Sequence, residues 1–461
     1  MYKRDTIAAI STAVGDGGIG IIRVSGSEAI EIVDLLFKGK EENKLINSTS
    51  YKAHYGHIVE RESGKIIDEV ITLVMKAPKT YTTEDVVEIN CHGGIVVLQK
   101  ILNLVLKAGV RLAEPGEFTK RAFLNGRIDL AQAEAITDLI RSKTEAGLEV
   151  ALKQLEGSLS NKINDIRQDI VSLLAHLEAT IDFPDDEVEE FDPNQLDTRI
   201  GGIINKVEDL IKTSNRGKIL KEGIKAAIIG KPNVGKSSLL NALLREKRAI
   251  VTDIPGTTRD IIEEVINIDG IPVKIIDTAG IRETEDVVEK VGVEKSEDLL
   301  KEADLILLVL DASQAISEEE LDIVKKANDK DIILVINKVD LKEEIELGDI
   351  ELILDSKDIV KTAAIDNEGI DKLEDTISSL IFRGDISSNS DTLISNIRHK
   401  NALDRAYGRL LDVQKTFQMG LPNDFITIDL RAALESIGEI TGDTIGEDII
   451  DQIFADFCLG K

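Results

Sequence analysis

The stretch Gly230-Lys-Pro-Asn-Val-Gly-Lys-Ser237 sets the architecture of the middle of this chain. It follows the apolar run Ala226–Ile229 and precedes a helical pattern over Ser238–Leu244. Glycines in such a loop let backbone N–H groups turn inward on an anion, and the amino terminus of the following helix adds positive potential. The same spacing can arise as an incidental glycine-rich turn, but its position between a strand and a helix favours a phosphate-binding loop.

Residues in this loop and two motifs after it predict the contacts to phosphate and metal. Lys236 would supply a point charge to the β- and γ-phosphates, and the Ser237 hydroxyl would ligate Mg²⁺. The motif Asp277-Thr-Ala-Gly280 ends an apolar strand, where its carboxylate can hold Mg²⁺ through water and its last N–H can sense the γ-phosphate. Between the two motifs lies Thr257-Thr258, where a hydroxyl could join the Mg²⁺ shell when a nucleoside triphosphate is bound.

The motif Asn337-Lys-Val-Asp340 predicts that the base is guanine. Asp340 can accept both N1–H and N2–H of guanine, an arrangement that adenine does not offer. Asn337 would contact the other edge of the base, and the stem of Lys338 would cover its face. A further loop, Ala363-Ala364, could contribute a backbone N–H. In this order and spacing the elements predict a GTPase whose nucleotide contacts are Asn233, Val234, Gly235, Lys236, Ser237, Ser238, Thr252, Asp253, Ile254, Pro255, Gly256, Thr257, Thr258, Asp277, Thr278, Ala279, Gly280, Asn337, Lys338, Asp340, Ala363, Ala364 and Ile365.

The residue after Gly280 is Ile281, where many GTPases place the glutamine that orients the attacking water. An isoleucine side chain forms no hydrogen bond, so another group has to position the water. The charge that an arginine finger would supply also needs another source. Asn233 and the carbonyl-rich segment Val251–Thr257 suggest that source, because an amide oxygen and turn carbonyls could coordinate a large monovalent cation beside the phosphates.

Strands and helices alternate from about Gly223 to Phe382, as a doubly wound parallel sheet requires. Asp269-Gly270, between the second and third strands, is a strong hairpin signal, so we expect one antiparallel edge strand. The expected strands are Lys225–Ile229, Ile261–Ile268, Val273–Ile276, Leu305–Leu310, Ile332–Ile336 and Ile359–Thr362.

Segments with two other sequence patterns flank this αβ module. From Asp5 to about Leu112, β-rich runs alternate with helical patterns, which indicates a small α+β domain. From about Pro115 to Ser214 the pattern is helical, and helical periodicity returns from Asn396. We therefore expect the αβ module to be inserted within a helical domain. The acidic interruption at residues 182–192 indicates a solvated loop, with a metal or partner site as the alternative.

Composition limits the classes of function. The 461 residues suggest about three domains. Lys and Arg total 56 against 85 Asp and Glu, a net charge of −29, which argues against simple coating of nucleic acid or an anionic membrane. The two cysteines, Cys91 and Cys458, lack metal-ligand spacing, so a reducing cytoplasm fits best. No apolar run is long enough to span a membrane, and the amino terminus lacks a signal-peptide core.

Together with both ends of the chain, these motifs resemble the MnmE (TrmE) family of tRNA-modification GTPases over essentially the whole length. The likeness includes Gly17-Gly-Ile-Gly-Ile-Ile-Arg-Val-Ser-Gly26, Tyr81-Thr-Thr-Glu-Asp-Val-Val-Glu88 and the run from Pro115 to Glu134. It ends in Phe457-Cys-Leu-Gly-Lys461, whose Cys-x-Gly-Lys pattern is highly specific beside this amino terminus. Other GTPases share the phosphate loop but not these ends.

The resemblance implies a multidomain chain with α/β and α parts. Residues 1–114 would form an α+β tetrahydrofolate-binding and dimerisation domain, and residues 221–383 a Ras-like P-loop G domain. Residues 115–220 and 384–461 would form the two parts of one mostly helical domain. Family members are homodimers that form a heterotetramer with an MnmG (GidA)-type FAD protein. Together they install a carboxymethylaminomethyl or aminomethyl group on C5 of the wobble uridine of tRNA, with a one-carbon unit from 5,10-methylene- or 5-formyl-tetrahydrofolate.

The resemblance also assigns site residues. The family's GTPase is activated when two G domains meet in the presence of K⁺. The positions that match its potassium ligands are Asn233, Thr252, Ile254 and Thr257, and those that match its magnesium ligands are Ser237 and Thr258. The folate-contacting positions match Arg23, Glu88, Arg127 and Lys461. Glu289 matches the acid that orients water, and it stands with Lys236 and Cys458 as a candidate catalytic residue.

Some of these residues have ordinary structural explanations. Glu88 could pair with the N–H donors of a pterin, although without the resemblance an exposed strand carboxylate is the commoner explanation. Cys458 could be a thiol nucleophile or redox group, or a small residue on a tail. A regulatory GTPase in ribosome assembly or another RNA-linked checkpoint is the alternative function. Such relatives generally carry a basic RNA module after the G domain, whereas this carboxyl part is acidic.

Overall fold

A computed structural model describes residues 5–41, 44–182, 193–247, 264–276, 301–326, 330–346, 358–382 and 392–461. These residues form two compact units. The first comprises residues 5–137 and 435–461, and the second comprises the described residues between 138 and 434. Residues 183–192 of the acidic segment and residues 383–391 lie outside the described ranges.

The first unit is built on a seven-stranded sheet with the order β3-β4-β5-β6-β2-β1-β7. All neighbouring pairs are antiparallel except β1 and β7. The strands are β1 (Ile7–Ile10), β2 (Gly17–Ser25), β3 (Phe37–Lys38), β4 (Lys52–Val59), β5 (Ile66–Met75), β6 (Val86–Gly93) and β7 (Arg111–Leu112). The expected α+β texture is therefore confirmed.

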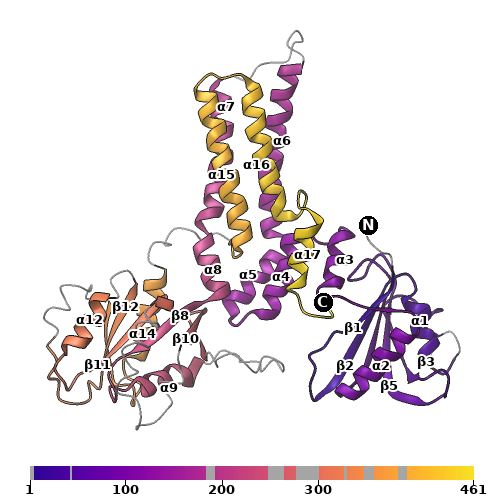
Figure 1. The fold of residues 1–461 in the computed structure, drawn as a ribbon, viewed down its shortest axis with the longest axis horizontal. Coiled ribbons are helices and arrows are strands. Elements are labelled where there is room, and N and C mark those ends of the chain that lie inside the picture. The colour runs from indigo at the N-terminus through magenta and orange to yellow at the C-terminus, as the bar shows by residue number, and fades with distance from the viewer. Residues whose placement is uncertain are drawn as a thin grey trace. The chain divides into compact units, whose positions relative to one another are not determined.

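One face of this sheet is covered by α1 (Ala29–Leu36) and α2 (Ile95–Lys107), which lie beside each other (Figure 1). Alternate strand residues such as Ile22, Val87 and Ile89 join these helices in one buried core. The remaining helices of the unit are α3 (Glu117–Leu124) and α17 (Glu447–Ala455), and α4 (Leu130–Arg141) begins in it. Because side chains alternate across a strand, the residues between these core positions point away from the helices.

The second unit contains a six-stranded sheet with the order β13-β12-β11-β8-β10-β9. The strands are β8 (Ile224–Ile229), β9 (Glu264–Ile268), β10 (Ile271–Ile276), β11 (Leu305–Asp311), β12 (Asp331–Asn337) and β13 (Ile359–Thr362). Every expected strand is present within one or two residues, although residues 261–263 of the second lie outside the described ranges. The associated helices are α9 (Lys236–Lys247), α12 (Glu318–Lys326) and α14 (Ile370–Ile381).

The sheet is parallel except for β9, which forms the expected antiparallel edge with β10. Asp269 and Gly270 turn this hairpin with φ of 49° and 88°, the two positive values that a type I′ turn needs. All seven residues of β11 are buried, since apolar clusters cover both faces of a parallel sheet.

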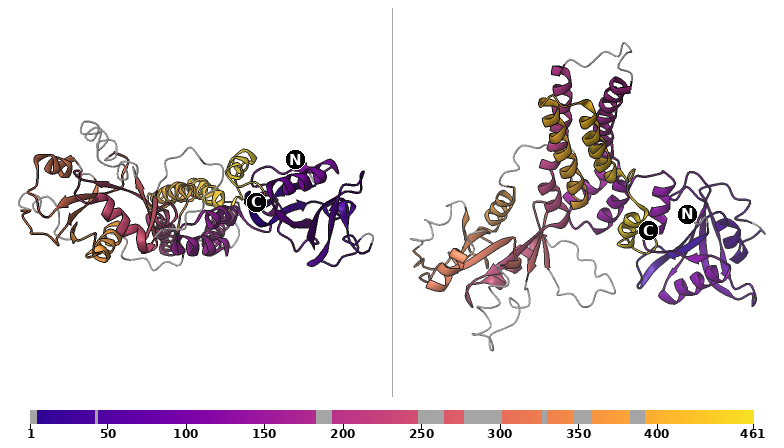
Figure 2. Two further views of the ribbon diagram at one scale, coloured as in Figure 1. Left: turned by 90° about the horizontal axis from the view of Figure 1, so that it is seen from below. Right: turned by 45° about the horizontal axis from the view of Figure 1, so that its top comes forward.

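The helices before and after this sheet pack against each other. They are α5 (Glu145–Leu155), α6 (Ser158–Asp182), α7 (Pro193–Lys212), α8 (Ser214–Glu222), α15 (Ile397–Gln418) and α16 (Asn423–Thr441). α15 lies along α7, and α6, α7, α15 and α16 run side by side (Figure 2). α6 buries an apolar stripe that includes Ile163, Ile170 and Leu177.

The chain enters and leaves the sheet module at one place. The Ile394 N–H donates to the Thr213 hydroxyl at 3.1 Å, just before α8 leads into β8. A Cβ atom on Gly217 would lie 2.3 Å from the Ile394 carbonyl oxygen, so only glycine permits this approach. Residues on the two sides of the module are therefore in direct contact.

A buried ion cluster ties the first unit together around Arg121, which is fully buried. Its guanidinium donates to Asp5 Oδ1 at 2.8 Å, Glu84 Oε2 at 3.0 Å and Glu117 Oε1 at 3.0 Å. Arg111 contacts two of the same carboxylates, Asp5 at 2.7 Å and Glu117 at 2.6 Å. Removing one partner from such a cluster leaves uncompensated buried charge.

We expect Arg121→Met to destabilise the first unit by about 3 kcal/mol at pH 7, because three carboxylates lose their shared partner. Hydrogen-exchange mass spectrometry of the full chain should show faster exchange in β1 and β7. The matched control is Arg61→Met, which alters an exposed turn residue. Equal protection in the two variants would contradict a stabilising role for the cluster.

The cluster also predicts a pH dependence. Hydrogen bonding to Arg111 lowers the pKa of Asp5. Burial alone would raise the pKa of Glu117, but hydrogen bonds from Arg111, the Glu114 N–H and Arg121 lower it overall. Carboxyls with depressed pKa values stabilise the fold above their unfolded pKa, and this contribution is lost as the pH falls through the folded pKa. The difference between wild type and Arg121→Met should therefore shrink below about pH 4.

Candidate functional site

The phosphate loop lies between β8 and the first turn of α9. Asn233 and Gly235 adopt left-handed backbone conformations, with φ of 63° and 101°. The Lys236 ammonium, half-buried, donates to the carbonyl oxygens of Gly230 and Lys231, each at 2.7 Å. Burial lowers the pKa of this ammonium. The loop therefore curls around the cation that the sequence predicts to contact phosphate, with Ser237 next to it in the first turn of α9.

The side chain of Asn337 joins the phosphate loop to the loop after β13. Its Nδ2 donates to the Val234 carbonyl at 2.9 Å, and its Oδ1 accepts from the Ala364 N–H at 3.1 Å. A Cβ on Gly235 would lie 2.1 Å from Nδ2, so this position requires glycine. The amide is only 2% exposed. Asn337 thus aligns the two loops, and its predicted contact with the base stays a prediction.

Lys338, at the base motif, is held by an ion pair that the sequence analysis missed. Its ammonium donates to Asp311 Oδ2 at 2.7 Å, and Asp311 also accepts from the Ser313 hydroxyl at 2.7 Å. Burial alone would raise the pKa of Asp311, but the hydrogen bonds from Lys338 and Ser313 lower it. Asp311 ends an apolar strand, a position at which a carboxylate could have been recognised as a candidate. The pair fixes the Lys338 stem that is expected to cover the base.

The remaining base-site residues lie beside this pair. Asp340 is exposed in the turn after β12. Ala363 and Ala364 are buried, and both of their N–H groups bond within the protein, to the Glu368 carbonyl and to Asn337. Ile365 is 74% exposed at the same loop. The structure therefore brings the phosphate loop, Asn337, Lys338 and this loop together at one edge of the sheet.

Several predicted residues lie outside the described ranges, so no geometry is assigned to them. They are Thr252, Asp253, Ile254, Pro255, Gly256, Thr257, Thr258, Asp277, Thr278, Ala279, Gly280 and Glu289. Of the expected K⁺ and Mg²⁺ ligands, only Asn233 and Ser237 are described.

The predicted folate positions gather at a second place, in the first unit. Arg23 on β2 pairs with Glu88 on β6, with Nε and Nη2 both bound to Oε1 at 2.9 and 2.8 Å. The terminal segment packs beside them, since the Gly460 carbonyl accepts from Arg23 Nη1 at 3.4 Å and from the Ser11 hydroxyl at 3.1 Å. Burial, together with the Arg23 charge, lowers the pKa of the Lys461 ammonium. Three of the four predicted residues therefore form one cluster.

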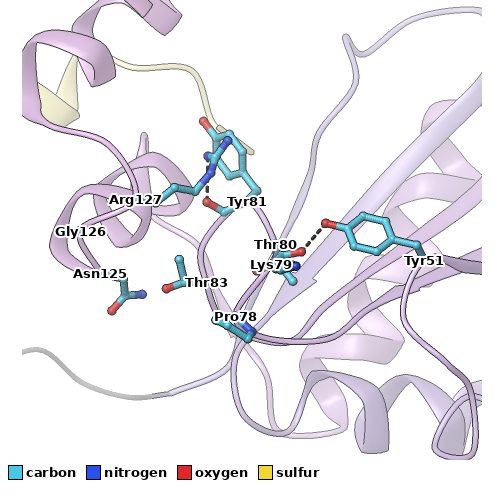
Figure 3. A pocket seen from close by; sticks show the side chains of 9 residues that line it. All are labelled: Tyr51, Pro78, Lys79, Thr80, Tyr81, Thr83, Asn125, Gly126 and Arg127. Atoms are coloured by element: carbon cyan, nitrogen blue, oxygen red, sulfur yellow. Dashed lines mark hydrogen bonds between the residues drawn. The ribbon is translucent and has the colours of Figure 1, made fainter. Parts of the chain in front are cut away.

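The fourth residue, Arg127, joins this cluster through Tyr81. The Arg127 guanidinium carbon lies 4.8 Å from the centre of the Tyr81 ring, and that of Arg23 lies 5.3 Å from it. Arg127 also donates to the Tyr81 carbonyl at 3.0 Å (Figure 3). Stacking of guanidinium groups on an aromatic ring is favourable. Tyr81 is the first residue of the stretch Tyr81–Glu88, and the sequence alone did not indicate this stacking role.

The two cysteines differ in environment. Cys91 is buried, and burial raises the pKa of its thiol to about 11, which makes it a poor thiolate source. Cys458 is exposed and lies in the terminal segment, where its carbonyl accepts from the Gly116 N–H at 3.3 Å. A nucleophilic or redox role for Cys458 stays a prediction.

A phosphate loop between β8 and α9, tied by Asn337 to the loop after β13, is the arrangement expected of a P-loop GTPase, and the chain is an enzyme of that class. The chain belongs to the tRNA modification GTPase MnmE family. The model of the MnmE helical domain matches residues 130–458, and that of the GTP-binding protein TrmE N-terminus matches residues 6–127.

Relatives named tRNA modification GTPase MnmE match over almost the entire chain. Those of Alkaliphilus oremlandii and Acetivibrio thermocellus are each 52% identical over 461 residues, which is 100% of both chains. That of Bacillus mycoides is 52% identical over 458 residues, 99% of each chain. Among solved structures, the FeoB G domain of Methanococcus jannaschii covers 34% of this chain and 97% of its own at 24% identity, with a TM-score of 0.25 that is too low to carry weight. Across the described part of the chain, every helix is too short or too polar to cross a membrane.

The ion pair of Asp311 and Lys338 should strengthen the binding of every nucleotide whose base the Lys338 stem covers. We expect Asp311→Asn to weaken GTP and xanthosine triphosphate binding alike, by roughly tenfold, because a charged hydrogen bond is lost. Asp340→Asn should instead shift the preference toward xanthosine triphosphate, since the amide replaces an acceptor with a donor. The measurement is calorimetric affinity for both nucleotides.

Glu343→Gln is the matched control, because it breaks an exposed ion pair with Lys361 in the same module. If Asp311→Asn changes the base preference but not the overall affinity, Lys338 does not act as a platform. A retained GTP preference in Asp340→Asn would remove Asp340 from the base site.

Proposed function

We propose that this chain is the GTP-hydrolysing component of wobble-uridine modification in tRNA, at C5 of U34. It acts in the cytoplasm with an MnmG (GidA)-type FAD protein in a heterotetramer, and together they add a carboxymethylaminomethyl or aminomethyl group. One observation carries the proposal: a single chain holds a GTPase site and a separate cluster of Arg23, Glu88, Arg127 and Lys461. A purely regulatory GTPase has no use for the second cluster.

The second cluster has the chemistry that a tetrahydrofolate derivative requires. A reduced pterin presents several N–H donors, and a carboxylate can accept two of them. Glu88 uses Oε1 for Arg23, and no contact of its Oε2 is found in the described part of the chain. Arg23, Arg127 and Lys461 bring positive charge to a chain of net charge −29, which suits the carboxylates of a folate. The one-carbon unit would come from this ligand, and the protein's part is to bind and orient it.

The described residues also fit the two expected cations. Asn233 stands in the phosphate loop with a left-handed backbone, where its amide oxygen can serve a monovalent ion, and the Ser237 hydroxyl opens α9. Mg²⁺ prefers oxygen ligands and bridges phosphates at such loops. K⁺ would neutralise charge that develops between the β- and γ-phosphates when two G domains dimerise.

A homodimer is supported by the open face of the first unit's sheet. Tyr55, Ile71 and Ile19 are 62%, 52% and 67% exposed on the face opposite α1 and α2. Tyr55 and Ile71 are paired across β4 and β5, and the next partner on β6 is Asn90. A sheet face with several large exposed apolar side chains suits contact with a second copy. Residues 1–114 would then serve dimerisation, with residues 221–383 as the G domain inserted between helical parts 115–220 and 384–461.

The test of this function is the modified-nucleoside profile of tRNA from a strain that lacks the chain. Loss of the C5 substituent on the wobble uridine is expected. Unchanged tRNA together with aberrant ribosomal particles would instead select a regulatory GTPase of ribosome assembly. Complementation with Asp340→Asn, which is deficient in GTP recognition, should fail to restore the substituent.

The cation mechanism predicts that hydrolysis depends on K⁺. Steady-state turnover should be higher in KCl than in NaCl at equal ionic strength, because Na⁺ is smaller than the ligand set requires. Asn233→Ala should abolish this difference and leave GDP binding largely intact. Glu289→Ala should lower turnover about 10²-fold or more, the scale of a lost catalytic group, with little change in nucleotide affinity.

Asn241→Ala is the matched control, since Asn241 is exposed on α9 of the same module. Equal wild-type rates in the two salts would overturn the cation mechanism. Normal turnover of Glu289→Ala would leave the attacking water without an assigned partner.

A further inference from the structure

A cavity of about 550 Å³ opens beside the second cluster. Tyr51, Lys79, Tyr81, Thr83 and Arg127 are among the residues that line it (Figure 3). Two of the lining residues are cations, and none of the described lining residues is Asp or Glu. Because acids outnumber bases in this chain by 85 to 56, a cavity with only positive charge stands out. Its chemistry suits an anion.

The side chain of Tyr81 connects the cavity to the cluster of Arg23 and Glu88. Tyr81 lines the cavity, and its ring lies 5.3 Å from the Arg23 guanidinium carbon and 4.8 Å from that of Arg127. Arg127 lines the cavity as well. The described residues thus run in a fixed order, from a carboxylate at Glu88, past an aromatic ring at Tyr81, to cations at Arg127 and Lys79.

We propose that this cavity binds the glutamate tail of the folate, including its γ-linked glutamates. The proposal rests on the folate site proposed above and extends it. A folate has a pterin head with N–H donors, an aminobenzoyl ring and a tail of carboxylates, in that order. Glu88 would take the head, Tyr81 would lie against the ring, Arg127 would take the carboxylates of the first glutamate, and Lys79 would take those of the added γ-linked glutamates. The order of chemistry in the ligand matches the order in the protein.

The wall of the cavity is held in place by bonds that a ligand need not form. The Asn125 side chain donates to the Thr82 carbonyl at 2.7 Å, and the Thr80 hydroxyl donates to the Glu84 carbonyl at 2.7 Å. The Tyr51 hydroxyl donates to the Lys79 carbonyl. Buried Arg121 fixes Glu84 itself. A preformed wall lowers the entropy cost of binding, because its own side chains need no ordering when the tail enters.

Other anions could meet the same cations, and an RNA phosphate is the main competitor. The geometry favours the tail, because Tyr81 and Arg127 belong to the cavity and to the folate cluster alike. A phosphate backbone would need cations that continue beyond the cavity, whereas the chain's overall charge is negative. We therefore assign the tail, and the experiment includes the alternative.

The test compares 5-formyltetrahydrofolate with its triglutamate by calorimetry on the full chain. We expect the triglutamate to bind about threefold more tightly, because the exposed ion pair with Lys79 adds modestly. Lys79→Met should remove most of this gain and leave the monoglutamate affinity nearly unchanged. Lys65→Met, an exposed lysine in the same unit, is the matched control and should keep the gain. The gain should shrink at high salt, because exposed pairs are screened.

The outcomes separate the tail from the folate site. Equal affinities for the two folates, with both bound, would overturn the tail assignment and leave the folate site standing. Binding of neither folate would overturn the folate site and the tail together. If a short single-stranded RNA is weakened by Lys79→Met while the folate gain is unchanged, the cavity serves RNA phosphate and the tail assignment is wrong.

Discussion

Parallel pairing of β8, β11, β12 and β13 is the constraint on which the nucleotide site depends. It places the carboxyl ends of four strands at one edge, and loops that lie more than 100 residues apart in sequence meet there. The register is specific: Asp311 is paired with Asn337, and Asn337 with Thr362. These residues supply the Lys338 anchor, the link between loops, and a hydroxyl that donates to that link at 3.2 Å. A shift of one residue would turn every one of these side chains to the other face.

The first unit reaches a comparable precision by different means. Its sheet is antiparallel apart from β1 and β7, and one face is partly exposed, so side chains rather than strand ends form the site. Arg121 is decisive because it binds the start of β1, the loop with Glu84 and the helix with Glu117. That loop also carries Tyr81, whose ring lies against both Arg23 and Arg127. Packing at the centre of the unit therefore controls geometry at its surface.

Much of this could be predicted from the sequence, and the limits have physical reasons. Strands buried on both faces read as continuous apolar runs, and the Asp269-Gly270 turn identifies the antiparallel edge, so the second sheet was predictable. The phosphate loop was predictable because glycine, lysine and serine each have a defined task there. The roles of Asp311 and Tyr81 could not be predicted, because they depend on partners that only the fold brings near. Asp311 pairs with Lys338, and Tyr81 lies against Arg23 and Arg127. The role of Asn337 was incompletely predicted, because its link to Val234 depends on strand register.

The contact between Gly217 and Ile394 has a consequence for the history of this architecture. A segment whose two ends lie together can be spliced into a host at one surface position without rewriting either core. The helical part could close over the same position with a short turn, since Thr213 and Ile394 already touch. The coding sequence can therefore be divided just before and just after the nucleotide-binding segment without breaking up either core.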